Sequence, residues 1–290
     1  MSQQLIKHLP HFISEKGQLL TNAGIDRGKG EIEMILCFVL GCDRLQLYLH
    51  GESLLKENHL KQIDDIITRR LTREPLQFIL KESWFYGRKF FVSPAVMVPT
   101  PETELLCETA LGFIKQKEIQ SPKIIDLGVG SGVIAVTLAL ELQECEITAL
   151  DISAEALEIA KKNADDLGAS KKITFIESDY FAHVPDGEKF DLILANPPYI
   201  SEDEYKELPP EVLADPKVSL TSDNEGLAAI MTILRDAPKF LKPNGRIMFE
   251  IGYNQAEKVA ELTSQNADYD SIVIMKDLNN IDRVIILGCA

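Results

Sequence analysis

The sequence lacks long apolar stretches. None of its hydrophobic runs approaches the roughly 18 residues that a membrane-spanning helix needs. Its start, Met1–Leu5, also lacks the basic flank and apolar core of a secretion signal. From these absences we predict a cytoplasmic protein without a membrane partner.

Cysteine is scarce and shows no pattern. The chain of 290 residues contains five cysteines and no Cys-x-x-Cys pair. An odd number of scattered cysteines argues against a disulfide framework and against a structural zinc site. The five histidines form no ligand pattern either. We therefore predict no metal site.

Basic residues are few relative to acidic ones. The chain has 30 lysines and arginines against 45 aspartates and glutamates, a formal net charge of −15. Nucleic acids are bound mainly through Lys and Arg contacts to phosphates, which an acidic chain disfavours. We predict no direct nucleic-acid partner, although a local basic patch would still permit one.

The first part of the chain, residues 1 to about 80, has the apolar spacing of helices and no strand-like alternation. Two examples of this spacing are the sets Leu5, Ile6, Leu9, Phe12, Ile13 and Ile32, Ile35, Leu36, Val39. We predict a small helical domain over residues 1–80.

Residues 81–99 change to an aromatic pattern that surrounds a turn at Gly87, which predicts a β-hairpin linker. A helix is predicted to begin after this linker. Thr100 supplies a capping hydroxyl there, and Pro101 stands at the first helical position.

The remainder, residues 100–290, alternates strands and helices. The predicted strands are 123–127, 146–150, 173–176, 190–195, 246–251, 271–276 and 283–287, and the predicted helices between them include 133–142, 154–167 and 227–240. Alternation of this kind predicts an α/β domain with a doubly wound, mostly parallel seven-stranded sheet. The short connection between the last two strands predicts that this pair is antiparallel.

A glycine-rich loop follows the first of these strands. Gly128, Gly130 and Gly132 alternate with Val129 and Ser131. Glycines at such positions let the backbone turn sharply and approach a ligand closely, and ligands of open α/β sheets bind at the carboxyl ends of strands. The alternative is a tight strand-to-helix turn without a ligand.

The loop departs from the phosphate-binding patterns. A dinucleotide fingerprint needs glycine where Val133 stands, and no Gly-Lys-Ser/Thr follows as in a P-loop. A cofactor without phosphate, such as S-adenosylmethionine, fits better.

Asp151, at the end of the second strand, can accept hydrogen bonds from ribose hydroxyls, although alone it could cap a helix. After the third strand, Asp179 can meet an adenine amino group and Tyr180 can pack on the base.

The fourth strand ends in Asn196-Pro197-Pro198-Tyr199. An amide or aromatic amine nitrogen is a poor nucleophile, because its lone pair is delocalised. The Asn196 side-chain oxygen and the Pro197 carbonyl can accept hydrogen bonds from its two N–H groups, and the Tyr199 ring can stack on the flat acceptor. We therefore predict Asn196, Pro197 and Tyr199 as catalytic and all four residues as substrate-binding. A proline-rich turn without a function is the alternative.

Glu250 ends the next strand and can reach the same pocket. The opposing interpretation is an acid in solvent at the edge of the sheet.

Several stretches along the chain resemble the bacterial peptide-chain release factor glutamine methyltransferases. They are Arg73–Ile79, then Phe85, Gly87, Phe90 and Val92, then Val98–Glu104, Asp126–Gly132, Asn196–Ile200, and Phe249–Gly252 with Gln255. The Asn-Pro-Pro-Tyr motif is shared with adenine-amino methyltransferases, so the segment from Arg73 to Glu104 is the more specific part.

The resemblance implies a Rossmann-like methyltransferase fold and methylation of the glutamine side-chain nitrogen in the Gly-Gly-Gln loop of translation release factors. S-adenosylmethionine would be the methyl donor and S-adenosylhomocysteine the product. Cofactor contacts are implied for Gly128, Gly130, Gly132, Asp151, Tyr180 and Asn196. Two residues depart from the family pattern: Thr100 stands where arginine is usual, and Tyr180 often corresponds to tryptophan.

The prediction is therefore an S-adenosylmethionine-dependent protein-glutamine methyltransferase that acts as a monomer on release factors. The helical domain over residues 1–80 would dock the protein substrate. Two alternatives remain: an adenine-amino methyltransferase acting on DNA or RNA, and a non-catalytic cofactor-binding scaffold. Product analysis on DNA, RNA and release factor tests the first alternative, and retention of both the glycine loop and Asn196 argues against the second.

Overall fold

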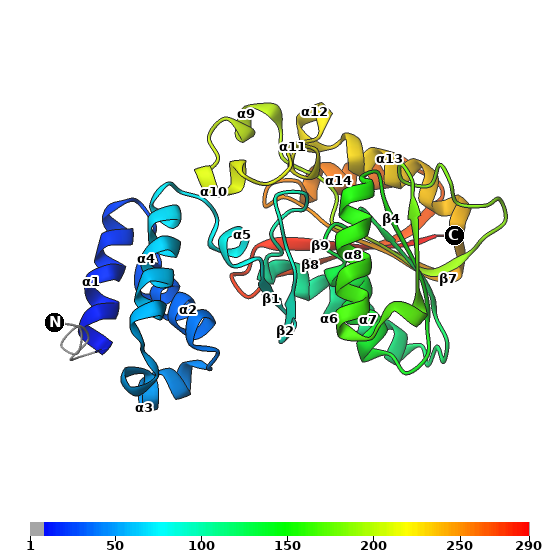
Figure 1. Cartoon of the computed structure of the whole chain (residues 1–290). Coiled ribbons are helices and arrows are strands. Elements are labelled where there is room, and N and C mark those ends of the chain that lie inside the picture. The colour runs from blue at the N-terminus through cyan, green and yellow to red at the C-terminus, as the bar shows by residue number, and fades with distance from the viewer. Residues whose placement is uncertain (1–8, 290) are drawn as a thin grey trace. The chain divides into compact units, whose positions relative to one another are not determined.

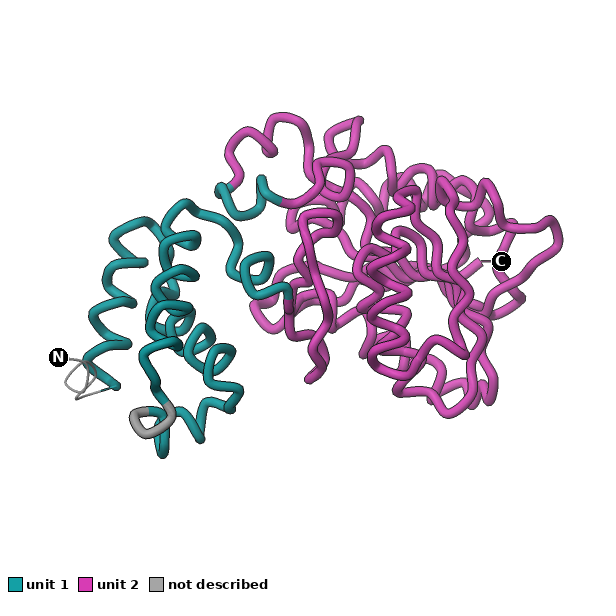
Figure 2. The backbone as a smooth tube through the Cα atoms, in the orientation of Figure 1, with its two compact units in different colours: residues 1–81, 209–214 teal, residues 82–208, 215–290 magenta. Residues whose placement is uncertain are grey.

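The computed structural model describes residues 9–289, except for the side chains of residues 52–54. Leu5, Ile6 and the remainder of residues 1–8 lie outside the described part, as does Ala290. The chain divides into two compact units (Figure 2). The first comprises residues 1–81 with 209–214, and the second comprises residues 82–208 with 215–290.

The first unit is helical, as predicted for the N-terminal region (Figure 1). Its helices are α1 (Leu9–Asn22), α2 (Gly28–Leu40), α3 (Arg44–Leu54), α4 (Glu57–Leu71), α5 (Leu76–Leu80) and, from the distant segment, α10 (Pro210–Leu213). Of the described residues with helical spacing, Leu9, Ile13, Ile32, Ile35 and Leu36 are buried in its core, and Phe12 and Val39 pack against that core.

The second unit begins with a hairpin of β1 (Ser83–Phe85) and β2 (Arg88–Phe90). Tyr86 and Gly87 form its turn, both with positive φ angles of 51° and 72°. A two-residue turn with positive φ at both positions matches the twist of a hairpin. The strands end at Phe90, because the backbone N–H and carbonyl of the next residue, Phe91, bond the Asn163 side chain instead of a strand.

A seven-stranded sheet forms the centre of the second unit, with the order β5-β4-β3-β6-β7-β9-β8. The strands are β3 (Lys123–Leu127), β4 (Glu146–Asp151), β5 (Ile173–Glu177), β6 (Phe190–Ala195), β7 (Leu241–Glu250), β8 (Tyr269–Lys276) and β9 (Asp282–Cys289). Neighbours from β5 to β7 pair in parallel, and β9 is antiparallel to both β7 and β8. The predicted doubly wound sheet with an antiparallel final pair is confirmed.

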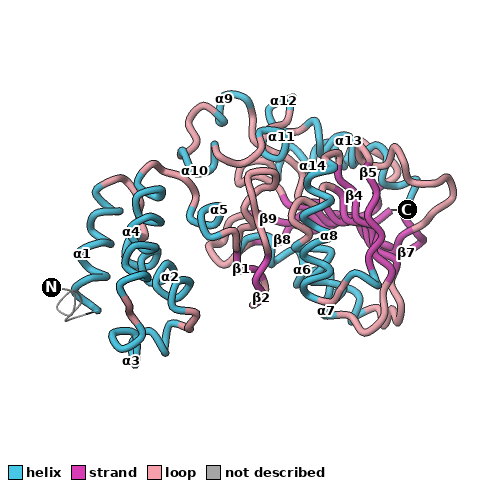
Figure 3. Tube along the Cα trace, in the orientation of Figure 1, coloured by secondary structure: helices cyan, strands magenta, loops and turns pink. Residues whose placement is uncertain are grey.

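Helices cover both faces of this sheet (Figure 3). One face packs against α6 (Glu104–Gln116), α7 (Val133–Glu141) and α8 (Ala154–Leu167). The other packs against α13 (Ala228–Asp236) and α14 (Ala256–Ser264). Burial on both faces explains why β6 is apolar apart from Asp191.

The helix start at Thr100 differs from the prediction. Thr100 makes no side-chain capping hydrogen bond, and a 3₁₀ turn, η1 (Pro101–Thr103), precedes α6. The Thr100 hydroxyl lies 3.4 Å from the Thr103 hydroxyl instead. Pro101 does occupy the first helical position, as predicted.

The segment from residue 201 to 226 carried no prediction, because it shows no apolar period. It folds into very short helices, namely α9 (Glu202–Tyr205), α10, α11 (Lys217–Leu220) and α12 (Asp223–Gly226). No helix within residues 9–289 is long and apolar enough to cross a membrane.

Candidate active site

A cavity of about 620 Å³ lies in the second unit at the carboxyl ends of β3, β4 and β6. Its size is within the range of about 300–1,000 Å³ that is typical of small-molecule sites. Its lining includes Pro94–Met97, Pro99, Thr103, Gly128–Ser131, Asp151–Ser153, Asp179, Tyr180, Asn196–Pro198, Pro216, Val218, Ser219 and Thr221–Asp223. The structure thus brings the predicted cofactor loop and the predicted acceptor motif together in one cavity.

The glycine loop is held against the end of β4. Gly128 and Gly130 have φ angles of 73° and 53°, in the left-handed region where glycine carries no Cβ penalty. The Gly130 N–H donates to Asp151 Oδ2 at 2.9 Å, and the Ser153 N–H donates to Asp151 Oδ1 at 2.9 Å. A carboxylate has about four acceptor positions, so Asp151 retains capacity for a ligand.

Gly132 has a different environment from the other two glycines. It does not line the cavity, and a Cβ added to it would lie 3.2 Å from Cα and Cβ of Ala160. Its φ of 86° is also left-handed. Gly132 therefore allows α7 and α8 to approach each other closely.

Asn163 connects the glycine loop to the segment after the hairpin, a role that the sequence did not reveal. Its Nδ2 donates to the carbonyls of Ser131 at 2.8 Å and Phe91 at 2.9 Å, and its Oδ1 accepts from the Phe91 N–H at 2.7 Å. The available signal was a polar residue at a buried position of α8.

Asp179 and Tyr180 line the cavity after β5. Tyr180 has a φ of 45°, uncommon for a residue with a side chain. Its carbonyl accepts from the Ser178 hydroxyl at 2.8 Å, which supports this conformation. Burial, with Asp179 adding, raises the pKa of the Tyr180 hydroxyl to about 12, so the ring stays neutral.

The Asn196 side chain is oriented by a chain of hydrogen bonds. Its Nδ2 donates to Thr103 Oγ1 at 3.0 Å, and the Thr103 hydroxyl donates to Glu250 Oε2 at 2.8 Å. An amide Nδ2 can only donate, so the Thr103 oxygen accepts from Asn196. Asn196 Oδ1 accepts no hydrogen bond from residues 9–289, and Asn196 lines the cavity.

Pro197 and Pro198 also line the cavity, whereas Tyr199 does not. The Tyr199 hydroxyl donates to Glu250 Oε1 at 3.2 Å. Burial and the neighbouring Glu250 raise the pKa of this phenol.

Two residues that the sequence did not single out as site residues hold the backbone after the acceptor motif. Gln255 Nε2 donates to the carbonyls of Tyr199 at 3.0 Å and Gly226 at 3.3 Å. Gln255 Oε1 accepts from the Gly252 N–H at 2.9 Å. A Cβ on Gly226 would lie 2.1 Å from the Tyr199 carbonyl oxygen, so only glycine fits there.

Glu250 is only 1% exposed, which excludes the interpretation of an acid in solvent. Burial raises its pKa to about 7, opposed by hydrogen bonds from Thr103 and Tyr199 and by the charge of Arg283, while Glu102 adds to the rise. Among residues 9–289, no three His, Cys, Asp or Glu side chains are grouped to hold a metal ion.

Comparison with known proteins assigns both regions of the chain. Residues 120–285 match the family model described as "Methyltransferase domain", and residues 13–80 match the "PrmC N-terminal domain". A "Release factor glutamine methyltransferase" of Chlorobaculum tepidum is 38% identical over 287 residues, which are 97% of this chain and 94% of that protein. The chain belongs to the release factor glutamine methyltransferase family.

Further relatives agree with this family. A "Bifunctional methyltransferase" of Rickettsia bellii is 33% identical over 94% of this chain, which spans about half, 53%, of that longer protein. Among solved structures, the hMettl16 catalytic domain in complex with MAT2A 3′UTR hairpin 6 superposes with a TM-score of 0.57 at 16% identity, over 77% of this chain and 82% of that chain. That likeness shows the fold alone.

We expect this methyltransferase to become less stable as pH rises through the pKa of Glu250. Its folded pKa of about 7 exceeds the ordinary 4.5, so the folded state binds the proton more tightly. The contribution of this bound proton to the free energy of unfolding is complete below pH 4.5 and is lost as pH rises to about 7. Its size is on the order of 3 kcal/mol. Buried Asp126 and Asp215, whose pKa values burial also raises to about 7, act in the same direction.

Urea unfolding of the wild type and of Glu250→Gln, measured between pH 5 and 8, tests this expectation. The substitution should reduce the loss of stability across this range. The same change at exposed Glu257 on α14 is the control and should leave the wild-type pH dependence intact. Equal pH dependence in wild type and Glu250→Gln would contradict the assignment.

Proposed function

We propose that the chain transfers a methyl group from S-adenosylmethionine to the side-chain amide nitrogen of the glutamine in the Gly-Gly-Gln motif of a translation release factor. Membership of the release factor glutamine methyltransferase family supports this substrate. The observation that carries the chemistry is the orientation of Asn196, whose Nδ2 is bound by Thr103 and whose Oδ1 remains for a ligand in the cavity.

The cavity suits S-adenosylmethionine in size and in chemistry. Carboxylates at Asp151 and Asp179 can accept hydrogen bonds from hydroxyl and amino groups, and the Tyr180 ring offers a flat apolar surface. Gly128, Val129, Gly130 and Ser131 supply backbone at the cavity wall. When bound, S-adenosylmethionine supplies a methyl group activated by a positively charged sulfur. For Gly132 we propose an indirect role, through the packing of α7 on α8.

Asn196 would bind and orient the acceptor nitrogen. Its Oδ1 accepts a hydrogen bond from one amide N–H, and the Pro197 carbonyl accepts from the other. Two acceptors on one amide increase electron density on the nitrogen and fix its direction toward the methyl group. The two acceptors would hold the nitrogen in place during transfer, and the nitrogen would then lose one proton to solvent.

Pro198 would complete the wall on which the flat amide lies. Tyr199 would act as a positioning residue, because its hydroxyl is bound to Glu250 and its carbonyl to Gln255. Proline has no N–H and a fixed φ, so the motif keeps its shape without donors that would compete for the acceptor atoms.

The proposal is tested by incubating the purified chain with methyl-labelled S-adenosylmethionine and a purified release factor. Label should be found on the motif glutamine by peptide mass spectrometry. It should be absent from a release factor in which that glutamine is replaced by asparagine. Parallel reactions with DNA and RNA test the adenine-amino alternative, and label in nucleic acid but not in the release factor would overturn the proposal.

A further inference from the structure

The segment that follows the acceptor motif contains six residues that belong with the helical unit. Pro209–Ala214, which includes α10, is part of the first compact unit, although its neighbours on both sides belong to the second (Figure 2). Within this segment, Glu211 supplies the side-chain bonds to the helices.

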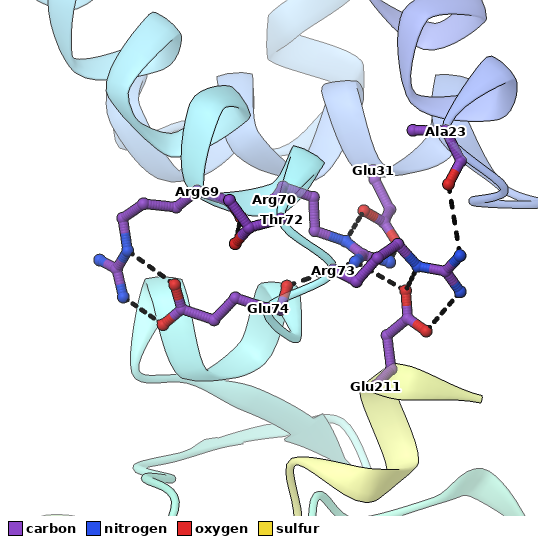
Figure 4. Close-up of polar contacts among 8 residues, drawn as sticks. All are labelled: Ala23, Glu31, Arg69, Arg70, Thr72, Arg73, Glu74 and Glu211. Atoms are coloured by element: carbon purple, nitrogen blue, oxygen red, sulfur yellow. Dashed lines mark hydrogen bonds and ion pairs between the residues drawn. The ribbon is translucent and has the colours of Figure 1, made fainter. Parts of the chain in front are cut away.

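Glu211 is bound by two arginines of the helical unit (Figure 4). Arg73 donates from Nε to Glu211 Oε1 and from Nη2 to Oε2, both at 2.6 Å. Arg70 at the end of α4 adds a bond from Nη1 to Oε1 at 2.8 Å. Bidentate Arg–carboxylate pairs combine charge with strict geometry and are among the strong hydrogen bonds of proteins.

Both arginines are held in place by other contacts. Arg70, only 3% exposed, donates to both carboxylate oxygens of Glu31 at 2.7 and 3.1 Å and to the Glu74 carbonyl at 3.3 Å. Arg73 donates to the Ala23 carbonyl at 3.3 Å. Glu31, Arg70, Arg73 and Glu211 thus form a charge-balanced group, hereafter the Glu211 cluster.

The ionisation of Glu211 agrees with this geometry. Burial of the carboxyl opposes ionisation, but the hydrogen bonds from Arg73 and Arg70 outweigh it and lower its pKa to about 2. Removing one partner from this partly buried group leaves a charge uncompensated, most of all at buried Arg70, so its members depend on one another.

The attached segment leads directly to the cavity wall. Asp215 follows Ala214, and its Oδ1 accepts from the Val98 N–H at 3.2 Å. Pro216, the next residue, lines the cavity, as do Met97 and Pro99 on either side of Val98. A short stretch of chain is therefore fixed on one side by the Glu211 cluster and on the other at the cavity.

We propose that the Glu211 cluster is a positioning device by which the helical unit sets the position of the segment between the acceptor motif and Pro216, and thereby the binding of the protein substrate. The part that concerns the substrate rests on the proposed function. The helical unit would then contribute to substrate binding through the segment that its two arginines hold.

Glu211→Gln and Arg73→Ala, singly and together in the full-length chain, test this proposal. Each should speed hydrogen exchange of backbone amides in residues 209–222 by about tenfold or more, the change expected for loss of a charged hydrogen bond. KM for the release factor should rise by a similar factor, with the affinity for S-adenosylmethionine unchanged. The double variant should show less than the sum of the single effects, because both changes remove the Arg73–Glu211 pair.

Arg69→Ala is the matched control. Arg69 precedes Arg70 on α4 and makes a bidentate pair with Glu74 without contacting α10. It should change neither exchange in residues 209–222 nor KM. Unchanged exchange in Glu211→Gln, equal effects in Arg69→Ala, or additive effects in the double variant would overturn the proposal. If the wild type methylates no release factor, the proposed function fails, and the exchange comparison still decides whether the cluster holds the segment.

Discussion

Replacing Asn196 by alanine is expected to lower the rate of methyl transfer by at least about a hundredfold, comparable to the loss of a preorganised polar group in other active sites. The change removes the Oδ1 acceptor and leaves the glycine loop and Asp151 intact. Turnover on release factor and calorimetric binding of S-adenosylhomocysteine measure the two effects separately. The affinity for the cofactor product should stay within a few-fold of wild type.

Asn254→Ala is the control for this experiment. Asn254 has the same side chain, but it lies in a neighbouring polar depression, and its amide donates to Glu204 Oε1 at 3.4 Å. Its variant should retain wild-type turnover. Wild-type turnover in Asn196→Ala would refute the proposed role of Asn196, and loss of binding in the same variant would mean that Asn196 serves the cofactor more than the acceptor.

Gly226→Ala is expected to damage both stability and activity. The added Cβ would lie 2.1 Å from the Tyr199 carbonyl oxygen, and the φ of 83° is left-handed. Backbone strain should lower the free energy of unfolding by about 1–2 kcal/mol, and overpacking should lower it by about 1–3 kcal/mol more. For a domain of this size the midpoint of thermal unfolding should fall by about 5–15 °C. Because the clash is with the acceptor motif, kcat should also fall by at least about tenfold.

Gly187→Ala separates strain from clash. Gly187 has nearly the same φ, 86°, but its Cβ would meet nothing within 4 Å. This variant should show only the strain, about 1–2 kcal/mol, with unchanged kcat. If both variants lost the same stability and both kept full activity, the close approach of Gly226 to Tyr199 would not matter for the site.

The strands, the main helices and the glycine loop could be predicted because each is encoded locally. The apolar stretch from Phe190 to Ala195 requires burial on both faces, and the glycines after Leu127 require an unusual backbone. The carboxyl ends of parallel strands also lie at the same edge of a sheet, which is why Asp151 and Asn196 could be placed near each other. The helices within residues 201–226 could not be predicted, because helices of one turn leave no periodic signal in the sequence.

The neighbours of the acceptor motif, by contrast, depend on segments far apart in the chain. Thr103, Asn196 and Glu250 meet only because η1, β6 and β7 end at one place. Glu250 is buried because distant segments cover it, and the same contacts turn the Tyr199 hydroxyl away from the cavity.

Local patterns were therefore sufficient to predict the sheet, the glycine-rich loop and the position of the acceptor motif at its edge, since backbone conformation and burial period are properties of neighbouring residues. Tertiary structure alone decided which way the Asn196 amide faces, why Gly226 must be glycine and that Glu211 pairs with Arg70 and Arg73. Hydrogen bonds and close contacts act over a few ångströms in space, and spacing along the chain does not record which distant residues come within that range.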